Sequence, residues 1–259
     1  MKALILAAGK GTRLRPITDY IPKPMVPLQG KPLLEWVLLH LMSYGISEYV
    51  IAISYLAEQI ENYFGDGSRW GIQIKYSHGV SPAGKAGEVW RCREFLSEED
   101  RFLVVPGDTI CHLNYRDFIH FHERQGGIVS VALSTKYQLE VGLAQVDQHG
   151  HISTFLEKAN LNTPVSSGSY ILENSIFPDI ESFHPERQEV DLPGDVFPKL
   201  LRERKDINGF VAEYDWWDIG RMSDYDALAH MPAMQAISLL AGHAQTKIMD
   251  YYAPHRPQH

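Results

Sequence analysis

The residues best suited to chemistry lie at the N-terminus of the chain. A short apolar segment, expected to form a buried strand over 3–8, runs into a glycine-rich loop. The loop carries Arg13, and ten residues later Lys23 stands between two prolines. Glycines let backbone N–H groups approach phosphate oxygens, while arginine offers a planar fork and lysine a point charge. The segment therefore predicts a site that binds a triphosphate.

Two familiar phosphate-binding motifs do not describe this loop. The dinucleotide fingerprint needs a third glycine at position 14, which is Leu14, and the spacing of Gly9 and Gly11 is not that of a P-loop. A bare pair of glycines is more often a turn between a strand and a helix, with solvated cations nearby. The composite with Arg13 and Lys23 is far more specific.

Carboxylates that could serve a phosphate site occur much later in the chain. Asp108 follows an expected buried strand, 101–105, and lies at the edge of the sheet where ligands bind in open α/β folds. Alone, a Gly-Asp pair is equally well a structural turn. Asp218 lies within Trp216-Trp-Asp-Ile-Gly220, with Asp215 as a possible neighbour. Asp224, by contrast, suits the N-terminus of a helix, where a carboxylate complements the helix dipole.

Composition sets the broad class. The chain has 259 residues, 44% apolar content and a formal charge of −8, which fits one α/β enzyme domain and no nucleic-acid partner. Its two cysteines suggest reduced thiols and a cytoplasmic protein. The apolar start is too short for a signal peptide, and no run reaches the roughly 20 residues that span a membrane.

Strands and helices alternate along the first half, which predicts a Rossmann-like, doubly wound, mostly parallel mixed sheet with helices on both faces. One domain is expected over 1–241, with one half over 1–135 and the other over 136–241. The polar tail, 242–259, is either poorly ordered or docks on a partner subunit of a homo-oligomer. Further expected strands are 49–54, 72–76, 128–134, 143–146, 151–156, 169–172 and 209–214, and expected helices are 32–44, 56–64, 86–96, 115–124, 195–202 and 223–240.

The segment Leu6–Leu34 closely resembles the signature of the sugar-1-phosphate nucleotidyltransferases. In register with that signature are Pro16, Thr18, Pro22, Lys23, Pro24, Pro27, Lys31, Pro32 and Glu35. The resemblance implies that a sugar 1-phosphate attacks the α-phosphorus of a nucleoside triphosphate, with Mg²⁺ required. It implies roles near the nucleoside for Leu6, Ala8 and Gly9, at the phosphates for Gly11, Thr12 and Arg13, at the reacting groups for Lys23, and as metal ligands for Asp108 and Asp218.

The resemblance implies that 1–135 is the nucleotide half of the domain and 136–241 the sugar half, and it is thinner on the sugar side. It implies that Gly142, Glu157, Lys158 and Ser167 bind the sugar phosphate. The chain departs from the family where Val141 replaces an aromatic residue, Ala159 a proline and Ser166 an asparagine. These changes leave the reaction class intact, and the hexose 1-phosphate stays open.

The nucleotide base is expected to lie against the loop 82–87. The resemblance places Gly84 and Gly87 there, and the pattern is closest to that of guanylyltransferases, which favours GTP and leaves dTTP, UTP and CTP open. Lys85 is either a phosphate contact or a solvated lysine. Rival readings are a glycosyltransferase, a cytidylyltransferase for a phosphate such as phosphocholine, and a catalytically silent regulatory homologue.

Overall fold

A seven-stranded sheet organises the protein. The computed structural model describes residues 1–137, 142–157, 163–220 and 222–230. Neighbouring strands are parallel except around β11, which is antiparallel to both of its neighbours, so the expected mostly parallel mixed sheet is confirmed. In sheet order the strands are β12 (Ile207–Ala212), β8 (Val129–Ser134), β11 (Val165–Glu173), β6 (Arg101–Pro106), β1 (Ala3–Leu6), β4 (Glu48–Ile53) and β5 (Gln73–His78).

Helices cover both faces of this sheet, as the alternation along β1 shows. Ala3 and Ile5 belong to one buried cluster and Leu4 to another, because successive side chains of a strand point to opposite faces. The first cluster includes side chains of α1 (Leu33–Ser43), α2 (Ala57–Phe64) and α5 (Tyr115–Gln125). The second includes α3 (Gly84–Arg91), α4 (Arg93–Leu96), α6 (Phe177–Glu181) and α7 (Phe197–Arg202).

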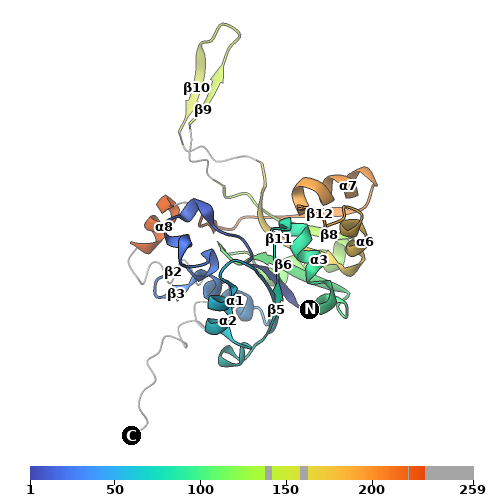
Figure 1. Cartoon of the computed structure of the whole chain (residues 1–259). Coiled ribbons are helices and arrows are strands. Elements are labelled where there is room, and N and C mark those ends of the chain that lie inside the picture. The colour runs from blue at the N-terminus through green and yellow to red at the C-terminus, as the bar shows by residue number, and fades with distance from the viewer. Residues whose placement is uncertain (138–141, 158–162, 221, 231–259) are drawn as a thin grey trace.

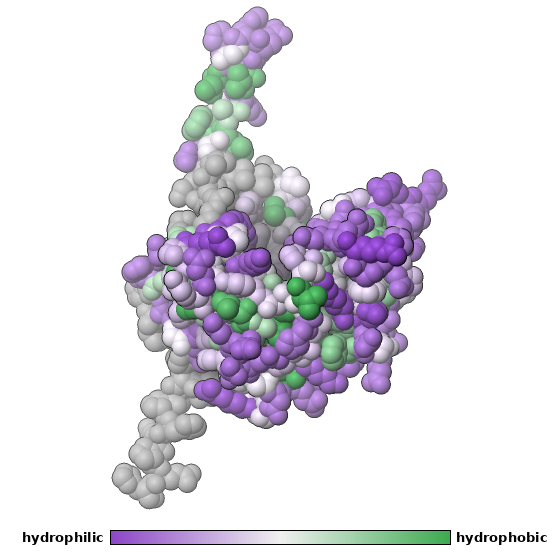
Figure 2. Space-filling model, viewed as in Figure 1, coloured by the Kyte–Doolittle hydropathy of each residue, from purple (hydrophilic) through white to green (hydrophobic). Residues whose placement is uncertain are grey.

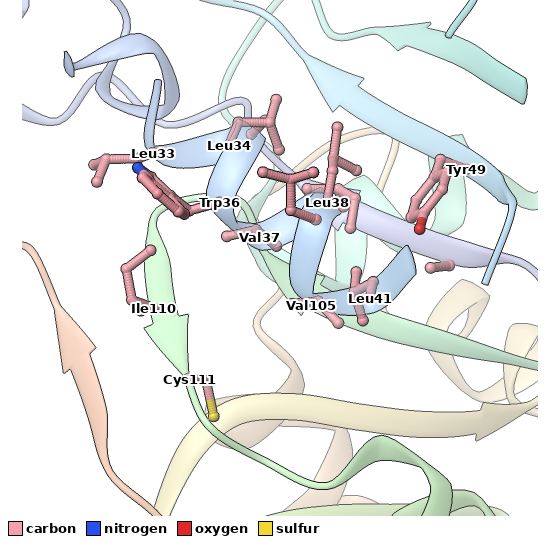
Figure 3. Packing of buried hydrophobic residues seen from close by; sticks show 14 of the residues in the cluster. Leu33, Leu34, Trp36, Val37, Leu38, Leu41, Tyr49, Val105, Ile110 and Cys111 are labelled. Atoms are coloured by element: carbon pink, nitrogen blue, oxygen red, sulfur yellow. The ribbon is translucent and has the colours of Figure 1, made fainter. Parts of the chain in front are cut away.

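Helix α1 packs in the part of the core that lies beside β7 (Thr109–Cys111). It is buried almost all round, and Figure 3 shows Trp36 lying against Ile110 of β7. The Trp36 indole donates a hydrogen bond to the carbonyl of Leu28, 2.9 Å away. Each large apolar side chain buried in this way contributes roughly 1.5–3 kcal/mol. The packing therefore fixes β7, which begins one residue after Asp108.

Two short ladders were not expected. Strand β13 (Trp216–Asp218) pairs antiparallel with β7, so that Asp218 lies opposite Thr109. Strands β2 (Pro27–Leu28) and β3 (Lys31–Pro32) form a second small hairpin before α1. The β7–β13 ladder joins two segments that lie far apart in the sequence and brings their aspartates to the same place.

A two-stranded arm projects from the body of the protein (Figure 1). It consists of β9 (Leu143–Val146) and β10 (Ile152–Leu156), which pair antiparallel as the expected hairpin. Figure 2 shows apolar surface along this arm, in contrast to the largely hydrophilic body. The exposed apolar side chains of the arm are Leu143, Val146, Ile152, Phe155 and Leu156.

Several expected boundaries move. The first strand ends at Leu6 because the glycine loop begins there, and the helix expected over 86–96 is divided at Cys92, whose ψ of 0° interrupts the helical path. The strand expected over 169–172 is the longer β11, and residues 192–196 form a π-helical turn before α7. Helix α8 covers Met222–Ala229 and His230 lies in a turn, whereas residues 231–240 of the helix expected over 223–240 and the tail 242–259 lie outside the described residues.

No helix among the described residues is long and apolar enough to cross a membrane.

Candidate functional site

The glycine-rich loop folds directly onto Lys23. Gly11 adopts a φ of +62°, and a Cβ there would lie 2.8 Å from Cβ of Lys23. The Thr18 hydroxyl donates to the carbonyl of Gly11 at 2.9 Å and holds the loop in this conformation. Leu14, at the end of the short helix Thr12–Leu14, is buried and anchors the far side of the loop. Glycine at position 11 is thus required by both the backbone conformation and the close approach of the lysine.

Lys23 joins the two aspartates. Its Nζ lies 2.6 Å from Oδ2 of Asp108 and 3.0 Å from Oδ1 of Asp218. The lysine side chain is only 8% exposed, whereas the aspartate side chains are 30% and 42% exposed. Arg13 adds a second cation, with Nη2 3.6 Å from Oδ2 of Asp218. We call these four residues the charge cluster; the sequence placed all of them at one site, and the structure brings them together.

Backbone geometry sets the position of each carboxylate. Asp108 lies two residues after the end of β6, and Asp218 ends β13, opposite Thr109 in the ladder. Gly107 allows the chain to pass β1, because a Cβ there would lie 3.2 Å from the carbonyl oxygen of Leu6. Hydrogen bonds between backbones, rather than flexible side chains, therefore hold the two aspartates side by side.

Gly220 is a site residue that the sequence analysis did not single out. A Cβ at this position would lie 3.0 Å from Nη2 of Arg13, so the guanidinium packs directly over the glycine. The signal was present in the Trp216–Gly220 motif, where the glycine follows Asp218 by two residues.

Three cavities meet at Asp108, which lines all of them. The loop cavity, about 210 Å³, is lined by Leu6, Ala7, Gly9, Gly11, Thr12, Arg13, Lys23, Pro24, Asp108 and Gly220. The α3 cavity, about 460 Å³, is lined by Leu6, Ala8, Gly9, Lys10, Ser54, Tyr55, Val80–Lys85, Glu88, Pro106 and Asp108. The β11 cavity, about 410 Å³, is lined by Arg13, Lys23, Lys85, Pro106, Asp108, Thr109, Ser166–Gly168, Tyr170, Pro193, Trp216 and Asp218.

Most of the predicted site residues line these cavities. The residues expected near the nucleoside lie on the α3 cavity, and those expected at the phosphates lie on the loop cavity. Ser167, expected on the sugar side, lines the β11 cavity, where its hydroxyl is 3.0 Å from that of Tyr214. Burial, above all, raises the pKa of Tyr214, so this phenol stays protonated at neutral pH. Lining residues missed at the sequence level include Lys10, Tyr55, Pro106 and Trp216.

Some predicted residues lie elsewhere. Gly87 lines none of the three cavities: it is buried, its amide donates to the carbonyl of Val190, and a Cβ there would lie 2.7 Å from that of Ala83. Gly142 and Glu157 lie on or beside the arm and line none of the cavities either, and Lys158 lies outside the described residues.

Asp215, expected as a possible neighbour of Asp218 in the site, forms an ion pair with Lys136 instead. Its Oδ1 lies 3.6 Å from Nζ of Lys136, and it lines none of the three cavities. The charge cluster therefore has two carboxylates, those of Asp108 and Asp218.

The cluster has the donor set that Mg²⁺ prefers. Because one ammonium contacts both Asp108 and Asp218, the two carboxylates are close enough to share one small cation. Magnesium in such sites is usually held by one or two carboxylates, substrate phosphates and water. Among the described residues, no group of three or more His, Cys, Asp or Glu side chains is placed to hold a metal. The residues fit a metal that binds together with phosphate.

Comparison with known proteins agrees with this geometry. Residues 2–232 match the family model described as nucleotidyl transferase. The chain is 39% identical over 242 residues to UTP–glucose-1-phosphate uridylyltransferase of Synechocystis sp., covering 87% of this chain and 61% of the relative. It is 32% identical over 238 residues to the mannose-1-phosphate guanylyltransferase catalytic subunit beta of Xenopus tropicalis, covering 87% and 62%. The chain thus spans about three fifths of the length of these relatives.

A solved structure shares the architecture. HddC from Yersinia pseudotuberculosis, complexed with GMP-PN, superimposes with a TM-score of 0.68 and 26% sequence identity, covering 88% of this chain and 97% of HddC. The sequence signature, the fold and the family model agree over almost the whole described part of the chain. The protein belongs to the nucleotidyl transferase family.

Proposed function

We propose that the protein transfers a nucleotidyl group from a nucleoside triphosphate to a sugar 1-phosphate, with release of pyrophosphate. The observation that carries the proposal is the charge cluster, in which Lys23 contacts Asp108 and Asp218 beside Arg13. It stands where three cavities meet, and such a junction suits a reaction between two separately bound anions. The activities named for the relatives support the same reaction class.

The step needs little covalent chemistry from the protein. An anionic oxygen of the sugar phosphate forms a bond to the α-phosphorus, and the bond from that phosphorus to the β-bridging oxygen breaks as pyrophosphate leaves. The nucleophile is already charged, so no strong general base is required. Catalysis then consists of positioning and charge neutralisation.

The described residues divide these tasks. Arg13, 65% exposed and beside the glycine loop, is placed to pair with the leaving pyrophosphate. Lys23, almost buried, holds the aspartates together and faces the reacting phosphates. A Mg²⁺ ion held by Asp108 and Asp218 would supply further charge neutralisation at the phosphate oxygens.

The substrates form the finer part of the proposal. The loop 82–87 favours GTP, whereas the uridylyltransferase relative supports UTP, so both nucleotides belong in the first comparison, together with dTTP and CTP. Glucose 1-phosphate and mannose 1-phosphate are the first acceptors to compare. A cytoplasmic location and a homo-oligomer are part of the same proposal; the two cysteines, both unpaired and buried, support the former.

The test is a pyrophosphate-release screen of five nucleoside triphosphates against a panel of sugar 1-phosphates, with Mg²⁺ present and then chelated by EDTA. Release with at least one pair, abolished by EDTA, is the expected result. Release with phosphocholine instead would favour the cytidylyltransferase alternative. No release with any pair from folded protein would favour the silent homologue and overturn the proposal.

A further inference from the structure

Lys85 occupies the boundary between two of the cavities. It is the second residue of α3 and is exposed, and it lines both the α3 cavity and the β11 cavity. Among the described residues, only Pro106 and Asp108 also line both cavities. A group that bridges the nucleotide side and the sugar side must therefore pass Lys85.

The backbone that carries Lys85 is held firmly. Gly84 adopts a φ of +71°, and a Cβ there would lie 2.4 Å from the carbonyl oxygen of Val190. That oxygen also accepts hydrogen bonds from the amides of Ala86 (2.9 Å) and Gly87 (3.2 Å), while the Val190 amide donates to the carbonyl of Ala83 at 2.8 Å. Val190 is itself buried. The start of α3 is thus fixed against a core residue.

This arrangement has a consequence for anion binding. The N-terminal amides of a helix commonly bind phosphate, but here two amides of the first turn already donate to Val190. The Lys85 side chain adds a full positive charge to this part of the wall, beyond what the partly occupied amides of the first turn can offer.

Lys85 also differs from the two cations of the charge cluster, Arg13 and Lys23. Arg13 contacts Asp218, and Lys23 contacts both aspartates. No carboxylate of the described residues lies within 4.0 Å of the Lys85 ammonium. The charge of Lys85 is therefore available to a ligand without breaking an ion pair within the described part of the chain.

We propose that Lys85 is a catalytic residue that binds the two phosphate groups being joined, the α-phosphate of the nucleotide and the phosphate of the sugar 1-phosphate. The inference rests on the proposed function and assigns a contact to a residue whose role the sequence left open. In the product, these two groups form the diphosphate that links nucleoside and sugar. Its charge lies where the α3 cavity opens into the β11 cavity.

The variant Lys85→Met removes the charge and retains much of the apolar stem. A hydrogen bond to a charged group implies that kcat/KM for the sugar 1-phosphate falls about tenfold to a hundredfold. Lys85→Arg should retain more of the activity because it keeps the positive charge. Lys75→Met is the matched control: Lys75 is an exposed lysine on β5 that lines none of the three cavities.

Binding separates a phosphate contact from support of the cavity wall. We expect calorimetry to show that Lys85→Met lowers the affinity for the nucleoside diphosphate sugar, the product of the wild-type reaction, by about tenfold or more. The affinity for the parent nucleoside should stay unchanged. Equal weakening of both ligands would assign Lys85 a structural role and overturn the inference. So would a Lys85→Met enzyme with wild-type kcat/KM. An inactive wild type would instead refute the proposed function, so the two failures are distinguishable.

Discussion

Replacing Asp108 by asparagine tests the centre of the proposed site. Asparagine keeps the shape of the side chain and an oxygen that can still accept a hydrogen bond from Lys23, now 2.6 Å from the carboxylate. The ammonium also contacts Asp218 at 3.0 Å, so it remains held in the variant. Asp108→Asn therefore removes one negative charge from the junction of the cavities and changes little else.

The expected effects on stability and on rate differ greatly. The Asp108 side chain is 30% exposed, so solvent screening limits its ion pair to about 1 kcal/mol of folding stability. In the proposed reaction the same carboxylate would help to hold the cation that neutralises the reacting phosphates, and removing one preorganised electrostatic group costs about 3 kcal/mol. At 1.36 kcal/mol for each factor of ten, turnover should fall by at least about a hundredfold.

The assay is pyrophosphate release with the substrate pair that wild type uses, alongside thermal unfolding followed by circular dichroism. Asp100→Asn is the control, because Asp100 is exposed, lines none of the three cavities and undergoes the same change of charge. Asp108→Asn with kcat within about threefold of wild type and an unchanged Tm would refute the reasoning.

Four further predictions concern other parts of the chain. Arg13→Ala should lower turnover by at least about a hundredfold with little change in Tm, which pyrophosphate release and calorimetry would show. Gly220→Ala should lower turnover about tenfold, because its Cβ would displace the guanidinium that lies 3.0 Å away; an unaltered rate would contradict this placement. Burial alone would raise the pKa of Asp179, but hydrogen bonds from Lys199 and Lys205 hold this pKa below its usual 3.8. The contribution of the ionised Asp179 carboxylate to folding stability is therefore complete above pH 3.8 and is lost as the pH falls through the lowered pKa. Asp179→Asn should therefore reduce the free energy of unfolding by about 2 kcal/mol at pH 7, and urea titrations should show the difference narrowing in acid. Burial raises the pKa of both Cys92 and Cys111 to about 12, so neither thiol should react with iodoacetamide at pH 8 until the protein unfolds, as mass spectrometry would reveal.

The sequence was most informative where the chemistry is local. The segment that carries Arg13 and Lys23 is continuous, so its residue types and spacing could be recognised directly. The alternation of apolar strands and helices predicted the fold class for a similar reason, because the spacing of apolar residues in a strand or helix can be read within a short segment of sequence. The placement of Asp108 at a strand end followed from the same pattern.

The remaining features depend on contacts between distant segments. Strands β7 and β13 are three residues each, too short to show a periodic pattern, and their pairing joins parts of the chain separated by most of the second half. The antiparallel placement of β11 between β6 and β8 also depends on pairing between strands that are distant in the sequence. Gly87 was expected in the site, yet its amide donates a hydrogen bond to the carbonyl of Val190. This contact joins residues about a hundred positions apart, so no local sequence pattern could reveal it.

The pairing of β7 with β13 separates the position of the two aspartates from the shape of the neighbouring β11 cavity. The ladder holds Asp218 beside Asp108 through main-chain hydrogen bonds between β7 and β13. The intervening stretch, 112–215, includes the projecting arm and the residues of β11 that line the β11 cavity. Substitutions on the arm and on the cavity-lining residues of β11 can reshape this cavity without breaking the ladder that holds the two carboxylates. The fold thereby lets the shape of the β11 cavity vary while the geometry of the charge cluster stays constant.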